Sequence, residues 1–244
     1  MRRFLPILPI AMLAALALPA FADDSPPQRT ISIDGKGEVT TAPDTAFVDA
    51  GVTTTAKTAR DALTENTKAM GDLITTLKTA GVSATDIQTS GFSVNPQYFY
   101  ADRDAEGNTP PPRITGYQVQ NGVNVRVRKL ADLGTILDQI VTVGANTING
   151  VNFTVDDPAK LLDEARKAAF ANAEAKAKTY ADAAGIGLGE VLTISERNTE
   201  SAPRPYAIRA MAAPMADKAV PVEAGQLTYD VDVSVQWALK GEAN

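Results

Sequence analysis

The chain has no cysteine and no histidine among its 244 residues, and these two absences remove several kinds of chemistry. Without cysteine there is no thiol nucleophile, no disulfide and no thiolate ligand for zinc or an iron–sulfur cluster. Without histidine there is no Ser-His-Asp relay and no side chain whose ordinary pKa lies near neutrality. Catalysis would have to use carboxylate, lysine, tyrosine, serine or threonine groups, and no cofactor is indicated.

Positive charge is also scarce. The chain carries 23 Lys and Arg residues against 29 Asp and Glu residues, a formal net charge of −6. A protein that binds nucleic acid needs a basic surface to neutralise phosphates, so this balance argues against nucleic acid as a partner. The remaining composition, 44% hydrophobic and 21% charged, is typical of a globular protein that buries a core without disulfides.

The first 22 residues have the three parts of a secretory signal peptide. Arg2 and Arg3 form a positive start, residues 4–18 are apolar, and residues 20–22 (Ala-Phe-Ala) have the small-residue pattern of a cleavage site. A retained membrane anchor is the alternative, but three prolines interrupt an apolar run that is barely long enough to span a bilayer. The sequence therefore predicts a cleaved signal peptide at 1–22.

Cleavage would leave residues 23–244 as a single mature domain. No cysteine follows the cleavage site, so a lipoprotein anchor is excluded. An exported chain without disulfides fits a bacterial periplasm better than a eukaryotic secretory pathway. We expect a soluble periplasmic protein with no transmembrane anchor after removal of the signal peptide.

Hydrophobic periodicity divides the mature chain into strands and helices. Strands are predicted at 31–39, 46–52, 92–100, 117–127, 146–155, 191–196 and 227–239, and helices at 57–80, 130–140 and 157–184. The order ββα, ββα, βα, ββ predicts an α+β fold with a largely antiparallel sheet and helices packed on its apolar face. The first two strands flank a turn at Pro43 and Asp44, and we expect them to form a hairpin.

A protruding hairpin arm is predicted where the strands at 92–100 and 117–127 flank the polar segment 101–112. Aromatic residues gather at its base: Tyr98, Phe99, Tyr100 and Tyr117. Such a group usually packs across the hairpin or into a core. The alternative interpretation is that the arm, residues 98–117, docks a neighbouring subunit.

Two further features have both a functional and a structural interpretation. Asn66 is a polar residue on the apolar stripe of the helix at 57–80. We favour a buried amide over a ligand contact, because buried amides generally find partners within the protein. Residues 199–222 contain four prolines and no periodicity, which indicates a flexible loop. Met211 and Met215 would give the same segment an adaptable contact surface.

Several motifs resemble binding sites without meeting their requirements. Gly35-Lys36-Gly37 and the glycines at 185–189 do not precede a helix N-terminus, so neither forms a phosphate loop. Asp102, Asp104 and Glu106 have the spacing of a calcium loop. Its twelfth position holds Arg113 in place of an acid, so we interpret this segment as an exposed acidic loop.

The acids Asp156, Asp157 and Glu164 raise the hypothesis of a glycosidase pair. Two such carboxylates must face each other across a cleft, about 5–10 Å apart. Acids at the start of a helix are explained by capping and by the helix dipole. The sequence therefore indicates no catalytic, cofactor-binding or metal-binding residue.

As a set, several segments resemble the SIMPL-domain (DUF541) family of bacterial periplasmic proteins. The resemblance covers essentially the whole mature chain and includes GKGEVTTAPDTAFVDAGV at 35–52, GVSATDIQTSGFSVNPQY at 81–98, ITGYQVQNGVNVRVRKLADLGTILDQIV at 114–141 and VPVEAGQLTYDVDVSVQWAL at 220–239. The family includes a periplasmic immunogenic antigen and an oxidative-stress-defence protein. The resemblance implies a self-associating α+β domain linked to envelope or oxidative stress, and it supplies no catalytic residue.

Three functions follow as hypotheses. The first is a non-enzymatic protein that acts in stress defence by self-association or partner binding, as a homo-oligomer with the arm at 98–117 in its interface. The alternative is a module that binds a small ligand or an envelope component through Asp230, Asp232 and Gln236, or through the loop at 199–222. The third is a carboxylate-dependent hydrolase, which requires two acids in one cleft.

Overall fold

The structure is a computed structural model that describes residues 28–103, 108–197, 204–206 and 220–240. Its elements are β1 (Thr30–Thr41), β2 (Thr45–Ala56), α1 (Ala59–Thr79), β3 (Ile87–Phe99), β4 (Arg113–Val127), α2 (Leu133–Thr142), β5 (Thr147–Thr154), α3 (Ala159–Ala183), β6 (Gly187–Arg197), β7 (Arg204–Tyr206) and β8 (Gln226–Lys240). Short 3₁₀ turns, Ala84–Asp86 and Leu130–Asp132, precede β3 and α2. Apart from β7, this is the predicted order, and the α+β class with antiparallel pairing is confirmed.

Two predictions fall wholly or largely on residues outside this description. The signal peptide predicted at 1–22 lies outside it completely. Of the loop predicted at 199–222, only residues 204–206 and 220–222 are described, and the first of these segments forms β7 against β8.

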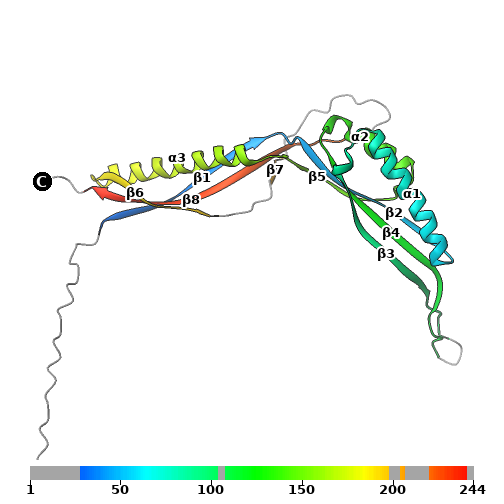
Figure 1. Cartoon of the computed structure of the whole chain (residues 1–244). Coiled ribbons are helices and arrows are strands. Elements are labelled where there is room, and N and C mark those ends of the chain that lie inside the picture. Colours follow the sequence, from blue (N-terminus) through cyan, green and yellow to red (C-terminus); the bar gives the residue numbers. More distant parts are fainter. Residues whose placement is uncertain (1–27, 104–107, 198–203, 207–219, 241–244) are drawn as a thin grey trace, which may run out of the picture.

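The strands form two antiparallel sheets where the sequence predicted a single one. The first sheet has the order β1-β8-β6, with β7 also paired to β8, and the second has the order β3-β4-β2-β5. Figure 1 shows the two sheets following one another along an elongated molecule, with α3 over the first sheet and α1 and α2 over the second. Each sheet thus has its helices on one face, as predicted.

The hairpin expected between the first two strands is wrong. β1 pairs with β8 along its whole length, from Thr30 opposite Ala238 to Thr41 opposite Leu227, whereas β2 pairs with β4 and β5. A tight hairpin turn needs residues with positive φ, and residues 42–44 have none. The chain therefore continues from the first sheet into the second without turning back.

The α1 helix packs on the second sheet through the apolar stripe that the sequence predicts. The Thr58 hydroxyl caps its start by accepting a hydrogen bond from Asp61 N, and the chain leaves it through Gly81 at φ +90°. Asn66 is fully buried on this stripe, and its Nδ2 donates to the carbonyl oxygens of Val52 at 2.9 Å and Val119 at 3.4 Å. The structural interpretation of Asn66 is therefore confirmed.

The α3 helix lies very close to β1 because both surfaces are small. Its buried face consists of Ala165, Ala169, Ala173, Ala177 and Ala181. A Cβ added at Gly35 would lie 2.1 Å from the Ala169 carbonyl oxygen, and one added at Gly37 would lie 2.0 Å from that of Ala165. The two glycines are thus packing residues, which agrees with the rejection of a phosphate loop.

Candidate functional site

Large apolar side chains are exposed along β3 and at the base of the predicted arm. The exposed fraction is 56% for Phe92, 50% for Tyr98, 47% for Phe99 and 72% for Tyr100. They are exposed because β3 is an edge strand, while α1 lies chiefly over β2 and β4. Tyr98, Phe99 and Tyr100 therefore do not belong to a core.

The contacts of these aromatic side chains are local. The rings of Tyr98 and Tyr100 lie 6.5 Å apart between centroids, and the Arg113 guanidinium lies 5.1 Å from the centroid of the Phe99 ring. Arg113 stands opposite Phe99 in the β3–β4 register, so this cation–π contact is the cross-strand packing that the sequence suggested. It leaves about half of the ring surface open to another molecule.

The tip of the arm is a two-stranded ribbon. β2 ends at Ala56, opposite Tyr117 of β4, and beyond this point residues 97–99 of β3 pair only with residues 113–116 of β4. Figure 1 shows this ribbon leaving the far end of the second sheet. Its outer edge, like the rest of β3, presents backbone groups that another strand can pair with, except at Pro96, which has no N–H.

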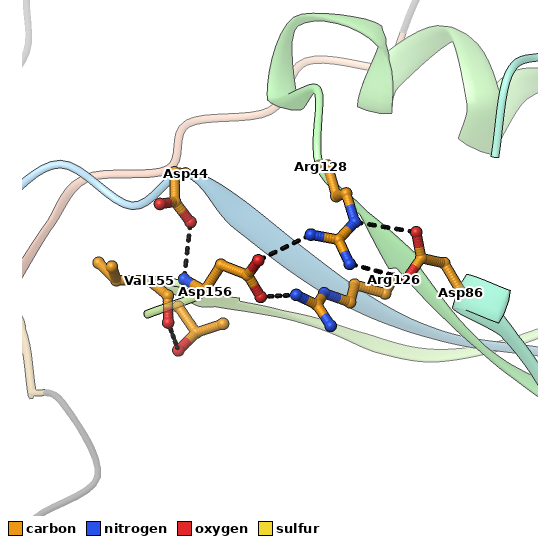
Figure 2. Close-up of polar contacts among 7 residues, drawn as sticks. Asp44, Asp86, Arg126, Arg128, Val155 and Asp156 are labelled. Atoms are coloured by element: carbon orange, nitrogen blue, oxygen red, sulfur yellow. Dashed lines mark hydrogen bonds and ion pairs between the residues drawn. The ribbon is translucent and has the colours of Figure 1, made fainter. Parts of the chain in front are cut away.

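A cluster of charged side chains lies where the chain crosses between the two sheets (Figure 2). Asp156, just after β5, contacts two arginines at the end of β4: its carboxylate pairs with Arg126 and accepts a hydrogen bond from Arg128 Nη1 at 2.7 Å. The backbone N–H of Asp156 donates to Asp44 Oδ1 at 2.8 Å. Both connections between the sheets, β1 to β2 and β5 to α3, are thereby fixed to each other and to β4.

Arg128 extends the cluster to the 3₁₀ turn before β3. Its Nε and Nη2 donate to the two carboxylate oxygens of Asp86 at 2.9 and 3.2 Å, and the Asp86 side chain is only 7% exposed. These hydrogen bonds hold the pKa of Asp86 below its usual 3.8 and raise the pKa of Arg128. A carboxyl group held ionised in this way cannot serve as a general acid near neutral pH.

A hollow of about 330 Å³ adjoins this cluster and contains the acids Asp86 and Asp132 together with the cations Arg126, Arg128 and Lys129. These are two acids in one cleft, as a hydrolase would require. However, Asp86 is bonded through both carboxylate oxygens to Arg128, so this acid is not able to donate a proton in the hollow.

A second hollow, of about 360 Å³, lies in the second sheet on the face away from α1. Gly51 of β2 stands opposite Gly122 of β4 at its floor. Asp49 lies at its rim, where Asn124 Nδ2 donates to Asp49 Oδ1 at 2.9 Å. The other polar side chains of the rim are hydroxyls and amides.

The residues predicted for ligand binding on the last strand are partly buried and have partners in β1. The Asp230 carboxylate lies 3.9 Å from Lys36 Nζ, and Gln236 Nε2 donates to Thr30 Oγ1 at 3.1 Å. Asp232 stands opposite Lys36 in the register. Lys36 also bonds to Glu38, which is the main reason that its pKa is raised. These contacts give the polar face of β8 a structural role, and ligand binding there stays a prediction.

The remaining sequence motifs have simple structural roles or lie beyond the description. α3 begins one residue later than predicted, with Pro158 in the N-cap position, and Asp157 Oδ1 accepts a hydrogen bond from the first helical N–H, that of Ala159, at 3.1 Å. Residues 104–107 of the acidic segment are outside the described part. Within that part, no group of three or more acidic side chains is placed to hold a metal ion. No described helix has the length and apolar character needed to cross a membrane.

Sequence patterns alone do not indicate the charged cluster or the hollow with glycines at its floor. The alternation at 123–128 places Arg126 and Arg128 on the polar side of a strand, which usually means solvent exposure. Their partners lie far away in the chain: Asp86 is 42 residues and Asp156 is 28 residues from Arg128. The only available signal was two arginines at the end of a strand, and it does not identify those partners.

Comparisons with known proteins agree on one family. The family model SIMPL, described as a protein of unknown function (DUF541), matches residues 31–237. The 26 kDa periplasmic immunogenic proteins of Brucella melitensis and Brucella abortus are each 43% identical over 238 residues, covering 95% of this chain and 94% of theirs. The uncharacterized protein YggE of Escherichia coli is 27% identical over 232 residues, covering 94% of this chain and 91% of its own.

Proposed function

Because the chain belongs to the SIMPL (DUF541) family, we propose that it is a non-enzymatic periplasmic protein that acts by self-association in envelope or oxidative-stress defence. The predicted signal peptide at 1–22 supports the location, as do the Brucella relatives, whose name describes them as periplasmic. The stress role rests on the family resemblance of the sequence.

The observation that carries the proposal is the exposed apolar surface of β3 and the arm. A ring that is fully buried removes about 150–250 Å² from water, so the three rings of Phe92, Tyr98 and Tyr100, each half exposed or more, supply about 300 Å² per copy and about 600 Å² for a pair. Val94, Ile114 and the strand backbone bring this to the range of about 1,000 Å² that specific interfaces exceed. A patch of about this size per copy is comparable to the largest apolar patch on a typical protein surface, and such patches are often functional.

A second copy of the same chain fits this surface well. Two β3 edges paired antiparallel would complete each other's backbone hydrogen bonds and bring the same aromatic residues together from both sides, as a two-fold interface requires. Arg113, near the tip of the arm, already lies over Phe99.

Native mass tests the proposal directly. We expect the purified chain to be an oligomer by light scattering, and the triple variant Tyr98→Ser, Phe99→Ser, Tyr100→Ser to be a monomer with unchanged circular dichroism. Tyr180→Ser is a matched control, because Tyr180 on α3 is 61% exposed and lies away from the arm. A wild-type chain that is a monomer at every concentration would reject self-association.

The stress role is tested in the source bacterium. A deletion strain should lose viability under peroxide and recover when the wild-type chain is restored. The triple arm variant should fail to restore it if assembly is needed. Full rescue by a monomeric arm variant would separate the stress role from self-association, and equal survival of the deletion strain would remove the stress role.

A further inference from the structure

The open face of the second sheet contains a hollow that the proposed function does not use. Its floor is set by Gly51 and Gly122, at which a side chain has no room: an added Cβ would lie 2.8 Å from the Asn121 carbonyl oxygen at the first and 2.6 Å from that of Ser90 at the second. Two residues that stand opposite each other on β2 and β4, Gly51 and Gly122, thus both lack a side chain. The side chains around them form the walls of the 360 Å³ space.

The walls offer one carboxylate and several neutral hydrogen-bonding groups in defined positions. The polar side chains of the rim are Asp49, Thr53, Ser90, Gln120, Thr147 and Asn149. Thr53 and Thr147 lie 3.3 Å apart between hydroxyl oxygens. Within the described part of the chain, the side chains of Ser90, Gln120 and Asn149 make no hydrogen bond, so they are available to a ligand.

This set of groups selects one class of ligand. No lysine or arginine lines the hollow, so an anion would meet only the negative charge of Asp49. No aromatic ring lines it either, and the lining includes few apolar side chains, so an apolar ligand would gain little. Amides and hydroxyls both donate and accept, as the neighbouring hydroxyl groups of a sugar do. The free Asp49 oxygen would add one strong acceptor for a sugar hydroxyl.

A row of similar side chains extends from the hollow toward the arm. On the same face, Ser93 stands opposite Gln120, and Asn95 stands opposite Gln118. Gln97 Nε2 donates to Gln118 Oε1 at 2.9 Å, which holds both amides in place. The row places further hydroxyl and amide side chains in a line from the hollow, so a linear chain of sugars could contact more of them than a single sugar could.

We propose that this face binds a neutral linear glycan, with one sugar over Gly51 and Gly122 and the following sugars along the row on β3 and β4. The site is separate from most of the proposed self-association surface, since Phe92 and Val94 stand opposite Asn121 and Val119 and hence on the other face, toward α1. Phe99, two residues after Gln97, lies at the end of the row on the open face. Occupation of one face leaves the other free.

Titration with a defined oligosaccharide tests the site. The probe is the β-1,4-linked N-acetylglucosamine trimer, which is neutral and carries hydroxyl and acetamide groups, added to the full chain and followed by calorimetry and by the amide NMR signals of Gly51 and Gly122. We expect saturable binding, with the monomer about tenfold weaker than the trimer because it leaves the row unoccupied. Equal binding of the monomer would reject the linear arrangement.

Single substitutions locate the binding. Gln120→Ala and Asn149→Ala should each weaken trimer binding about two- to tenfold, the effect of one lost hydrogen bond. Gln139→Ala on the outer side of α2 is the matched control and should leave binding unchanged. The proposal would be overturned if the wild-type chain showed no saturable binding of the trimer. It would also be overturned if Gln120→Ala and Asn149→Ala, with native circular dichroism, bound the trimer as tightly as the wild-type chain. Tighter binding of a sulfated oligosaccharide would contradict a neutral ligand.

Discussion

Removing the Asp156 carboxylate should loosen the junction between the two sheets, and its cost can be estimated from the geometry. In Asp156→Ala the backbone N–H still donates to Asp44, so the course of the chain is kept. What is lost is the carboxylate between Arg126 and Arg128. Arg128 retains both hydrogen bonds to Asp86 and is half exposed, so losing its contact with Asp156 should lower the free energy of unfolding only slightly.

The main cost comes from Arg126. Its side chain is 26% exposed against 37% for that of Asp156, and its Nε is buried without a hydrogen-bond partner. An exposed ion pair contributes about 0.2–1 kcal/mol and a hydrogen bond to a charged group about 1.5–3 kcal/mol. This pair is intermediate in burial, so we expect a loss of about 1.5 kcal/mol in the free energy of unfolding. For a domain of this size that lowers Tm by about 3–6 °C.

Urea and thermal unfolding, followed by circular dichroism, measure this effect. Asp138→Ala is the control, because Asp138 is an exposed acid on α2 whose side chain forms no ion pair with any described residue. A double-mutant cycle with Arg126→Met should give a coupling of about 1 kcal/mol between the two positions. A Tm for Asp156→Ala equal to that of Asp138→Ala, or a coupling of zero, would refute the account of the junction.

Three further predictions concern single positions. The pKa of Asp86 is lowered in the folded state, so its ionised carboxylate stabilises the fold at pH values above 3.8, and this contribution is lost as the pH falls through the folded pKa. In Asp86→Asn, the free energy of urea unfolding should no longer show this part of the dependence on acid pH. Asn66→Ala should cost about 1–3 kcal/mol in urea unfolding, because it leaves two buried carbonyls without their amide donor. Gly37→Ala should prevent native packing of α3, whereas Gly71→Ala, whose Cβ meets nothing within 4 Å on α1, should raise stability by about 0.5–1 kcal/mol. A destabilised Gly71→Ala or a native-like Gly37→Ala in thermal melts would contradict this reasoning.

Local patterns were sufficient to predict the elements of this fold. The stripe of α1 and the alanine face of α3 appear in the sequence because a helix buries positions three and four apart. The strict alternation in β8 appears for the same kind of reason, since a strand with one buried face alternates. Glycines after the helices marked their ends, as the positive φ of Gly81, Gly144 and Gly185 confirms.

The division into two sheets could not be predicted in this way. β1 joins β8 through pairs such as Thr40 with Thr228, whose side chains are in contact across 188 positions of sequence. Periodicity shows which residues of a strand share a face of the sheet but not which strand pairs with it. The expected hairpin between the first two strands followed from their nearness in sequence alone, and residues 42–44 lack the backbone conformation that a hairpin turn needs.

The arm shows a related difficulty at the level of the site. Its aromatic residues were recognised in the sequence, but burial depends on where α1 lies, and α1 leaves β3 uncovered. The same alternating strand therefore carries the exposed rings of Phe92 and Tyr98 on one face, and amides followed by Phe99 on the other. The sequence predicts this alternation, and only the arrangement of the helices decides whether a face is a core or a surface.

The proposed self-association along β3 should affect glycan binding on the open face of the second sheet, because both involve the β3 edge. If two copies pair along β3, the rows of amides and hydroxyls on their open faces become parts of one continuous surface, because a sheet extended at its edge keeps its two faces distinct. A glycan long enough to reach both rows would then be held at two sites, and its affinity would rise through effective concentration without any new contact. A short glycan would gain nothing from assembly. The dependence of binding on glycan length should therefore be steeper for the wild-type chain than for the triple arm variant, and this difference couples the assembly of the protein to the length of the chain that it holds.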